Sequence, residues 1–239
     1  MRFQTPLEPA VLIRRYKRFL ADCRLPDGRE VVAHVANPGA MTGLAQDGLR
    51  VWLEPNDDPK KKLKWAWRLA ELPEGGMACV DTGVANRVVR EALESGALRF
   101  GDYPQWWAEV AYGEKSRVDF LLEGPAGRLW LEVKSVTLAR QAGLAEFPDT
   151  VTARGARHMG ELAAKVAEGD RAGLLFVVMR DDCTAVSVAA DIDPAYARAV
   201  AAAQAAGVEI FAHRADLSPA GVTLGPELPP PLEIPAKAS

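Results

Sequence analysis

Cysteine and histidine are scarce in this sequence of 239 residues, which contains three of each. Cys23, Cys79 and Cys183 are far apart and odd in number, so they indicate reduced, buried thiols and not a disulfide framework or a zinc site. No apolar run approaches the ~20 residues that cross a bilayer, and basic residues replace the apolar stretch of a signal peptide. Phosphate-binding loops, dinucleotide-binding glycine motifs and nucleophile elbows are missing too. We therefore expect a cytoplasmic protein with no membrane partner.

The composition is that of an ordinary soluble protein, with 49% apolar and 26% charged residues. A chain of this length forms one large domain or two compact ones. The net charge of −3 conceals an asymmetry, because residues 1–78 carry 13 Lys and Arg against 10 Asp and Glu. The first third is thus basic and the remainder acidic. A basic front portion is compatible with nucleic-acid contact.

Residues 1–80 have the pattern of short strands separated by turns. Strand-like segments occupy 11–25, 30–36, 49–53, 63–72 and 77–80, and a helix-like piece covers 40–45. Pro26-Asp27-Gly28 and Asn37-Pro38-Gly39 are turn sequences. About five short strands with one helical piece predict a small closed barrel of the OB type, with an SH3-like barrel as the alternative.

The pattern changes after residue 80. Apolar residues at helical spacing predict a helix that ends near Gly96. Strand-like runs follow at 106–112, 117–123 and 128–136, then a helix over about 148–166, a buried strand at 173–179, a helix at 194–206 and a strand at 208–213. This order predicts a mixed α/β domain over 81–225, followed by a proline-rich tail over 226–239. The chain as a whole is therefore α+β, or mixed α/β.

One hairpin concentrates charged residues in apolar surroundings. If 117–123 and 128–136 pair around the turn at 124–127, Asp119 lies opposite Glu132, and Lys134 points to the same face as Glu132. Cross-strand neighbours lie ~4.5–5.5 Å apart, so two carboxylates there repel each other. Such a pair needs a shared proton or a bridging cation.

The residue types suit a metal-dependent phosphodiesterase. Carboxylate oxygens of Asp119 and Glu132 would hold Mg²⁺ or Mn²⁺, with the backbone carbonyl of Val133 as a further ligand. Lys134 would orient the attacking water and offset charge in the transition state. Glu91 and Glu109 are candidates for an additional catalytic carboxylate. The alternative interpretation is a solvated cluster of charges at a strand end, without metal.

Basic side chains are the candidates for contact with nucleic acid. Trp52, Trp65 and Trp67 would either stack on bases or fill the barrel core. His34, beside the second turn, has either a functional or a structural role. The basic candidates, to which we add one histidine, are Arg14, Arg15, Lys17, Lys60, Lys61, Lys62, Lys64, Arg154 and His158.

Sequence blocks along the whole chain resemble the sugar fermentation stimulation protein A family. They include Gly39-Ala40-Met41-Thr42-Gly43, Ser116-Arg117-Val118-Asp119-Phe120, Glu132-Val133-Lys134-Ser135-Val136 and Phe147-Pro148-Asp149. The resemblance implies a DNA-binding protein linked to regulation of sugar (maltose) metabolism. It also implies an N-terminal OB-like domain followed by a PD-(D/E)xK nuclease-like domain. The nuclease motif would fall on Asp119, Glu132 and Lys134, and the acid of the first helix on Glu91. The family often has Asn-Thr-Gly where this chain has Asn37-Pro38-Gly39.

Three hypotheses follow from these observations. The first is a nuclease that depends on Mg²⁺ or Mn²⁺ and cuts DNA, with RNA as the alternative substrate. The second is a DNA-binding regulator that keeps a nuclease-like scaffold without hydrolysis. The third is a protein that acts through protein partners and whose charge cluster is structural. A homodimer is compatible with all three.

Overall fold

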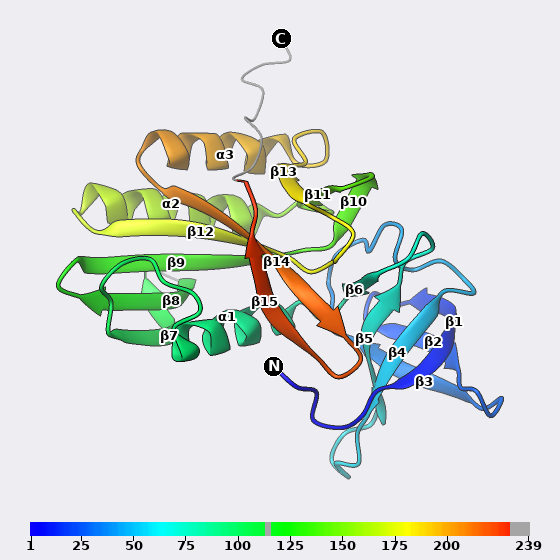
Figure 1. Ribbon diagram of the computed structural model, residues 1–239. Coiled ribbons are helices and arrows are strands. Elements are labelled where there is room, and N and C mark those ends of the chain that lie inside the picture. Colours follow the sequence, from blue (N-terminus) through cyan, green and yellow to red (C-terminus); the bar gives the residue numbers. More distant parts are fainter. Residues whose placement is uncertain (113–115, 230–239) are drawn as a thin grey trace.

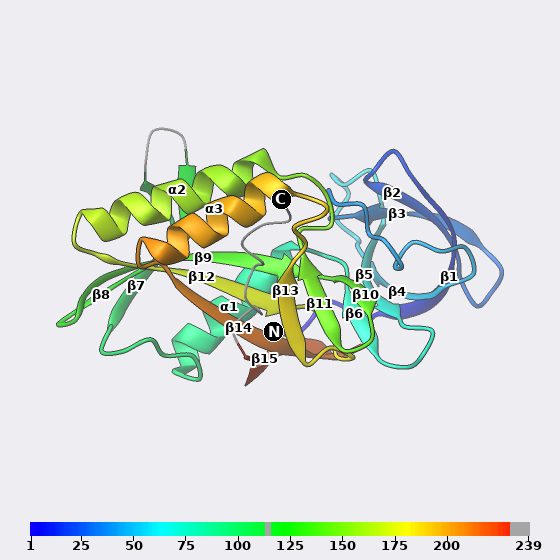
Figure 2. The ribbon, with the colours of Figure 1, turned by 90° about the horizontal axis from the view of Figure 1, so that it is seen from above.

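The computed structural model describes residues 1–112 and 116–229. It consists of a barrel, on the right in Figure 1, and a mixed α/β domain, on the left. Figure 2 shows the same two parts side by side when the molecule is seen from above. No helix within the described ranges is long and apolar enough to cross a membrane.

The barrel is built from residues 8–79. Its strands follow the order β3-β2-β1-β4-β5-β6, and a parallel pairing of β3 with β5 closes the sheet. Leu12, Val51 and Trp67 are fully or almost fully buried inside it, so Trp67 is core. The predicted OB-type barrel is confirmed. The strands are β1 (Glu8–Tyr16), β2 (Leu20–Arg24), β3 (Glu30–Val35), β4 (Arg50–Pro55), β5 (Trp65–Glu71) and β6 (Met77–Cys79).

Two local predictions for the barrel are wrong. The segment 11–25 is not one strand, because the chain turns at Lys17 and Arg18, which both adopt left-handed backbone conformations. Residues 40–45 form turns and not a helix, with Met41 also left-handed.

The α/β domain is a six-stranded sheet with helices on both faces. The strand order is β15-β14-β12-β9-β8-β7; α1 covers one face, and α2 and α3 cover the other (Figures 1 and 2). The elements of the large sheet and its helices are α1 (Gly83–Ser95), β7 (Gln105–Tyr112), β8 (Ser116–Gly124), β9 (Gly127–Val136), α2 (Ala153–Ala167), β12 (Arg171–Val178), α3 (Pro194–Ala205), β14 (Glu209–Ser218) and β15 (Gly221–Glu227).

Several elements differ from the predicted ones. A small three-stranded sheet of β10 (Leu138–Gln141), β11 (Leu144–Phe147) and β13 (Ala185–Val188) was not expected. Strand β11 ends at Phe147, and α2 begins at Ala153 and not near residue 148. Its cap is Thr152, whose hydroxyl accepts a hydrogen bond from the Gly155 amide at 3.0 Å. Strand β15 was also missed, and it extends two residues past the predicted domain end at 225. The predicted tail lies outside the described residues from 230 onward.

The β8–β9 hairpin has the register that the sequence predicts. Phe120 pairs with Leu131, and Gly124 pairs with Gly127. The ladder ends at Phe120–Leu131, so Asp119 and Glu132 lie one step beyond the last pair. The two strands diverge where the charged residues stand, which leaves room for their side chains.

Backbone hydrogen bonds fix the barrel to the α/β domain. The Cys79 amide donates to the Met179 carbonyl at 2.8 Å, and the Asp181 amide donates to the Met77 carbonyl at 3.1 Å. A side chain contributes as well, because the Met41 amide donates to Asp149 Oδ2 at 3.1 Å. The two parts therefore share one hydrogen-bonded junction.

A candidate metal and catalytic site

Asp119 bridges the gap between the diverging strands. Its Oδ2 accepts a hydrogen bond from the Val133 amide at 2.7 Å, and its Oδ1 accepts one from Asn86 Nδ2 at 2.6 Å. The Val133 amide has no partner in β8, because the ladder has already ended, and the carboxylate takes the place of a strand carbonyl. Asn86 comes from α1, so this acid is tied to a helix and to a strand at once.

Glu132 is buried, and its two oxygens have different surroundings. Oε1 accepts from Lys134 Nζ at 2.6 Å and is also hydrogen-bonded to His158 Nδ1. Oε2 is buried and has no hydrogen-bond partner among the residues that the structure describes. A buried carboxylate oxygen without a donor is costly, which indicates that another group, such as a cation, belongs beside it.

The pKa values of the two acids shift in opposite directions. Burial, and then the charge of Glu132, raises the pKa of Asp119 to about 6. Burial would also raise the pKa of Glu132, but the hydrogen bond from His158 and the charge of Lys134 outweigh it, so that pKa is lowered. The charge of Glu132 thus opposes the ionisation of Asp119, and a divalent cation between the two acids would remove this repulsion.

His158 lies inside the protein and not on a nucleic-acid surface. Its side chain on α2 is buried, and Arg154 Nε donates to His158 Nε2 at 3.2 Å. Because Nε2 accepts, Nδ1 carries the proton and donates to Glu132. The expectation that His158 contacts nucleic acid is therefore wrong, since the ring is used to hold Glu132.

The two additional acids occupy different positions. Glu91 Oε2 is paired with the amino group of Met1 at 2.6 Å, and the first helix presents Asn86, not Glu91, to Asp119. The contacts of Glu91 therefore do not join it to Asp119, and its catalytic role stays a prediction. Glu109 is exposed on β7 and has a left-handed backbone, with φ 57°. The pairs on either side, Ala108–Phe120 and Val110–Val118, place it across from Asp119, so Glu109 stays a candidate.

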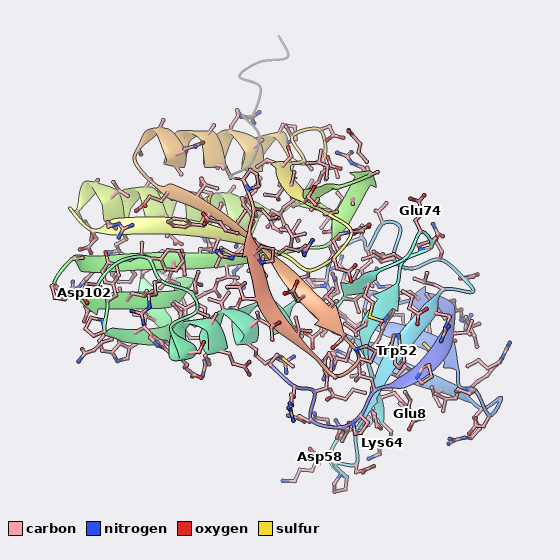
Figure 3. All side chains as sticks on the ribbon, in the orientation of Figure 1. Glu8, Trp52, Asp58, Lys64, Glu74 and Asp102 are labelled. Atoms are coloured by element: carbon pink, nitrogen blue, oxygen red, sulfur yellow. The ribbon has the colours of Figure 1, made fainter. Side chains whose placement is uncertain are left out.

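The predicted basic residues divide into structural and exposed ones. Arg15 is structural, because its guanidinium donates to four backbone carbonyls, those of Arg18, Asn37, Gly39 and Ala40. Arg14 is exposed and pairs with Asp22 at 2.8 Å. Lys60–Lys62 and Lys64 follow β4, and Lys64 Nζ donates to the Asp58 carbonyl at 2.8 Å. Figure 3 shows Asp58 and Lys64 together at the lower end of the barrel.

Sequence reasoning missed Asn86 and misread His158. Asn86 borders the buried face of α1, and a polar residue at such a border carries no distinct signal in one sequence. The pairing of His158 with Glu132 joins residues 26 positions apart on different elements. Only the packing of α2 on the sheet reveals it.

The donor set suits a hard divalent cation with few protein ligands. Within the described part of the chain, no group of three or more His, Cys, Asp and Glu side chains could hold a metal ion. A cation at this position would therefore take its remaining ligands from the backbone, from water or from a substrate oxygen. Mg²⁺, Mn²⁺ and Ca²⁺ all accept such mixed oxygen sets.

The fold and the charged cluster together define a class of two-domain proteins. In this class an OB-type barrel precedes a mixed α/β domain that carries an acid on one strand and an acid-x-Lys set on the next. The chain belongs to the sugar fermentation stimulation protein family. The SfsA N-terminal OB domain matches residues 13–80, and the sugar fermentation stimulation protein RE domain matches residues 83–221.

Relatives along the full length agree with this assignment. A sugar fermentation stimulation protein homolog of Ruegeria sp. (strain TM1040) is 58% identical over 96% of this chain and 100% of its own. A homolog of Paramagnetospirillum magneticum is 47% identical over 95% of this chain and 97% of its own. The solved structure of Pyrococcus furiosus SfsA, in complex with Ca²⁺, is similar with a TM-score of 0.84 and 27% identity, covering 95% of this chain and 96% of that one.

Proposed function

We propose that this protein is a divalent-metal-dependent nuclease that acts on DNA. The observation that carries the proposal is the buried Oε2 of Glu132, which has no hydrogen-bond partner among the described residues, near Asp119, with the amine of Lys134 on the other oxygen of Glu132. This arrangement has the acid, acid-x-Lys composition of a PD-(D/E)xK site. RNA is the alternative substrate.

The residues present fit a Mg²⁺ or Mn²⁺ ion. Asp119, Glu132 and the Val133 carbonyl would hold it, because they offer hard oxygen ligands where negative charge is otherwise unbalanced. When bound, the ion would polarise the scissile phosphate and lower the pKa of a bound water. The P. furiosus relative is described as a complex with Ca²⁺, which supports an oxygen-ligated divalent cation in this family.

Lys134 has the position of a residue that handles the attacking water. Its Nζ lies 2.6 Å from Glu132 Oε1, and only 14% of the side chain is exposed. The ammonium group of Lys134, fixed beside the scissile phosphate, would orient water through its N–H donors. It would also offset the charge that develops on the phosphate oxygens. His158 supplies a second hydrogen bond to the same glutamate oxygen, so Glu132 would stay held if Lys134 turned toward a water.

A non-catalytic DNA-binding regulator is the second candidate, and one observation favours it. The first helix presents the amide of Asn86 to Asp119, and no third acidic side chain completes the pair among the described residues. The relatives' name, which refers to sugar fermentation, would then reflect regulation of sugar metabolism genes through DNA binding. Such a regulator would bind DNA with a steep salt dependence and cut none.

A cleavage assay separates the two candidates. Purified protein is incubated with single-stranded, duplex and branched DNA and with RNA, with Mg²⁺, with Mn²⁺ or with EDTA. Lys134→Ala is expected to abolish cleavage, while Lys165→Ala, a lysine of similar exposure on α2, should keep it. If wild type and Lys134→Ala give the same cleavage on every substrate, the proposal of a nuclease is wrong. Binding without cleavage, unchanged or improved in Asp119→Asn, would establish the regulator.

A further inference from the structure

A cleft lies between the barrel and the α/β domain. Its volume is about 330 Å³, at the lower end of the ~300–1,000 Å³ range of small-molecule sites. The β1–β2 turn and the 37–39 turn form its barrel wall, and the end of β9 and residues 146–152 form the other wall. Residues of both domains thus enclose one space.

The lining of the cleft starts one residue along β9 from the candidate catalytic cluster. Ser135 lines the cleft and directly follows Lys134. The residues that precede α1 and α2, Thr82 and Thr152, line it as well. Asn86 and His158 stand four and six residues further along these helices, which is ~6–9 Å at the helical rise. A strand in the cleft would therefore reach the cluster within one or two nucleotides.

One buried polar atom at the cleft lacks a partner. The Ser135 hydroxyl is shielded from solvent and makes no hydrogen bond within the described residues, so a bound group would satisfy it once the side chain rotates toward the cleft. The acids of the cleft are already engaged. Arg140 donates to both oxygens of Glu146 at 2.8 and 2.6 Å, and Asp149 accepts the Met41 amide. Arg140 therefore offsets the charge of Glu146. The coulombic attraction between Arg15 and Asp149 offsets part of the charge that Asp149 keeps.

The turn that carries Arg18 is held in a strained shape. Lys17 and Arg18 have φ of 47° and 65°, a conformation that Asn and Gly adopt more readily. Arg15 fixes the turn by donating from Nε and Nη2 to the Arg18 carbonyl, at 3.1 and 2.7 Å. Strain that persists in a locked turn often serves function, and here it places the side chain of Arg18 along the cleft.

We propose that this cleft binds one unpaired nucleotide of a DNA strand, beside the phosphate that reaches Asp119, Glu132 and Lys134. Arg18 contacts a phosphate, and Ser135 hydrogen-bonds the same nucleotide. A stacked base pair exceeds a space of this size, so the substrate is single-stranded or locally opened. The inference rests on the proposed function for the position of the cut phosphate, but not for binding itself.

Binding measured without metal tests the cleft. Fluorescence anisotropy in EDTA follows a labelled strand of about 20 nucleotides, longer than an OB-fold site, and the corresponding duplex, over a series of salt concentrations. Arg18→Gly and Lys17→Gly are matched variants, since each removes one positive charge and one strained residue. Lys17 does not line the cleft. Thermal midpoints at or above that of wild type show that both variants fold.

Wild type is expected to bind the single strand at least tenfold more tightly than the duplex. Arg18→Gly should lower single-strand affinity about tenfold, reduce the salt slope by about 0.7, and leave duplex binding unchanged. Lys17→Gly should affect both probes equally or not at all. A wild type that binds duplex as well as single strand, or an Arg18→Gly variant that behaves like Lys17→Gly, overturns the inference. Absence of cleavage with metal would instead overturn the nuclease and leave this binding result intact.

Discussion

At the scale of single residues, the site depends on the different hydrogen bonding of the two carboxylate oxygens of Glu132. Glu132 Oε1 receives a lysine and a histidine, and Oε2 receives no donor from the described residues. The hairpin register was enough to bring Asp119 near Glu132, because alternation and pairing are local rules. The donors that set their charge could not be found this way. Asn86 and His158 arrive from helices whose packing the periodicity does not specify.

Removing His158 is expected to weaken metal binding. His158→Ala frees Glu132 to rotate, and loss of a residue that orients a ligand typically lowers metal affinity ~10–100-fold. His158→Asn retains a donor near the Nδ1 position and should recover most of that affinity. Titration calorimetry with Mn²⁺ measures all three proteins. Identical dissociation constants would show that His158 does not position Glu132.

The raised pKa of Asp119 predicts that the free energy of unfolding of the metal-free protein depends on pH. Because the pKa is about 6 in the folded state and ~3.9 when unfolded, folding favours the protonated acid, and stability falls as pH rises from about 4 through 6. Asp119→Asn abolishes this loss. The free energy of unfolding of the variant minus that of wild type should therefore rise by ~1–3 kcal/mol between about pH 5 and pH 8.

Urea denaturation in EDTA measures this difference. Asp191→Asn is the control, since the hydrogen bonds from Arg140 lower the pKa of Asp191 to about 2. Its stability relative to wild type should not change over the same range. An Asp119→Asn advantage that is equal near pH 5 and pH 8 would contradict the raised pKa.

At the scale of elements, the caps of two helices are joined. Asp193 caps α3 by accepting the Tyr196 amide at 2.9 Å, and its other oxygen accepts the amide of Thr152, the cap of α2, at 2.7 Å. The α3 start was predictable from Asp193-Pro194. The α2 start was not, because Pro148-Asp149-Thr150 has the composition of a helix start, while Asp149 is used at the domain junction. The four-residue strands of the small sheet were too short to show a period.

Loss of the shared cap should destabilise the protein. Asp193→Ala leaves two amides without acceptors at a buried position, and we expect a loss of about 2–4 kcal/mol in the free energy of unfolding. Asp193→Asn keeps one acceptor and should lose less. Chemical denaturation compares them with Asp216→Ala, an exposed acid. A loss for Asp193→Ala no larger than for Asp216→Ala would disprove the joint role.

At the scale of the whole molecule, the barrel and the α/β domain form one unit around the cleft. Both domain types were predictable, because strand alternation and helical periodicity extend over many residues. Their junction was not, because it depends on contacts such as Met41 with Asp149, 108 positions apart. Gly39 shows how tight the junction is, since a Cβ there would meet the three atoms of the Asp149 carboxyl group at 2.2–2.6 Å.

A double-mutant cycle tests this junction. Gly39→Ala should lower the free energy of unfolding by ~1–3 kcal/mol, because the methyl group displaces Asp149 from the Met41 amide. In an Asp149→Ala background the same substitution should cost much less, since the obstructing carboxylate is gone. Additive losses in the cycle would mean that the two residues do not meet across the junction.

The central claim is that Asp119 and Glu132 hold a divalent cation, and a crystal soaked in Mn²⁺ tests it most directly. The anomalous difference map should show one peak within ~2.0–2.6 Å of a carboxylate oxygen of each acid, and Asp119→Asn crystals should lose it. A map without a peak between these acids, or with Mn²⁺ bound only elsewhere, would contradict the account.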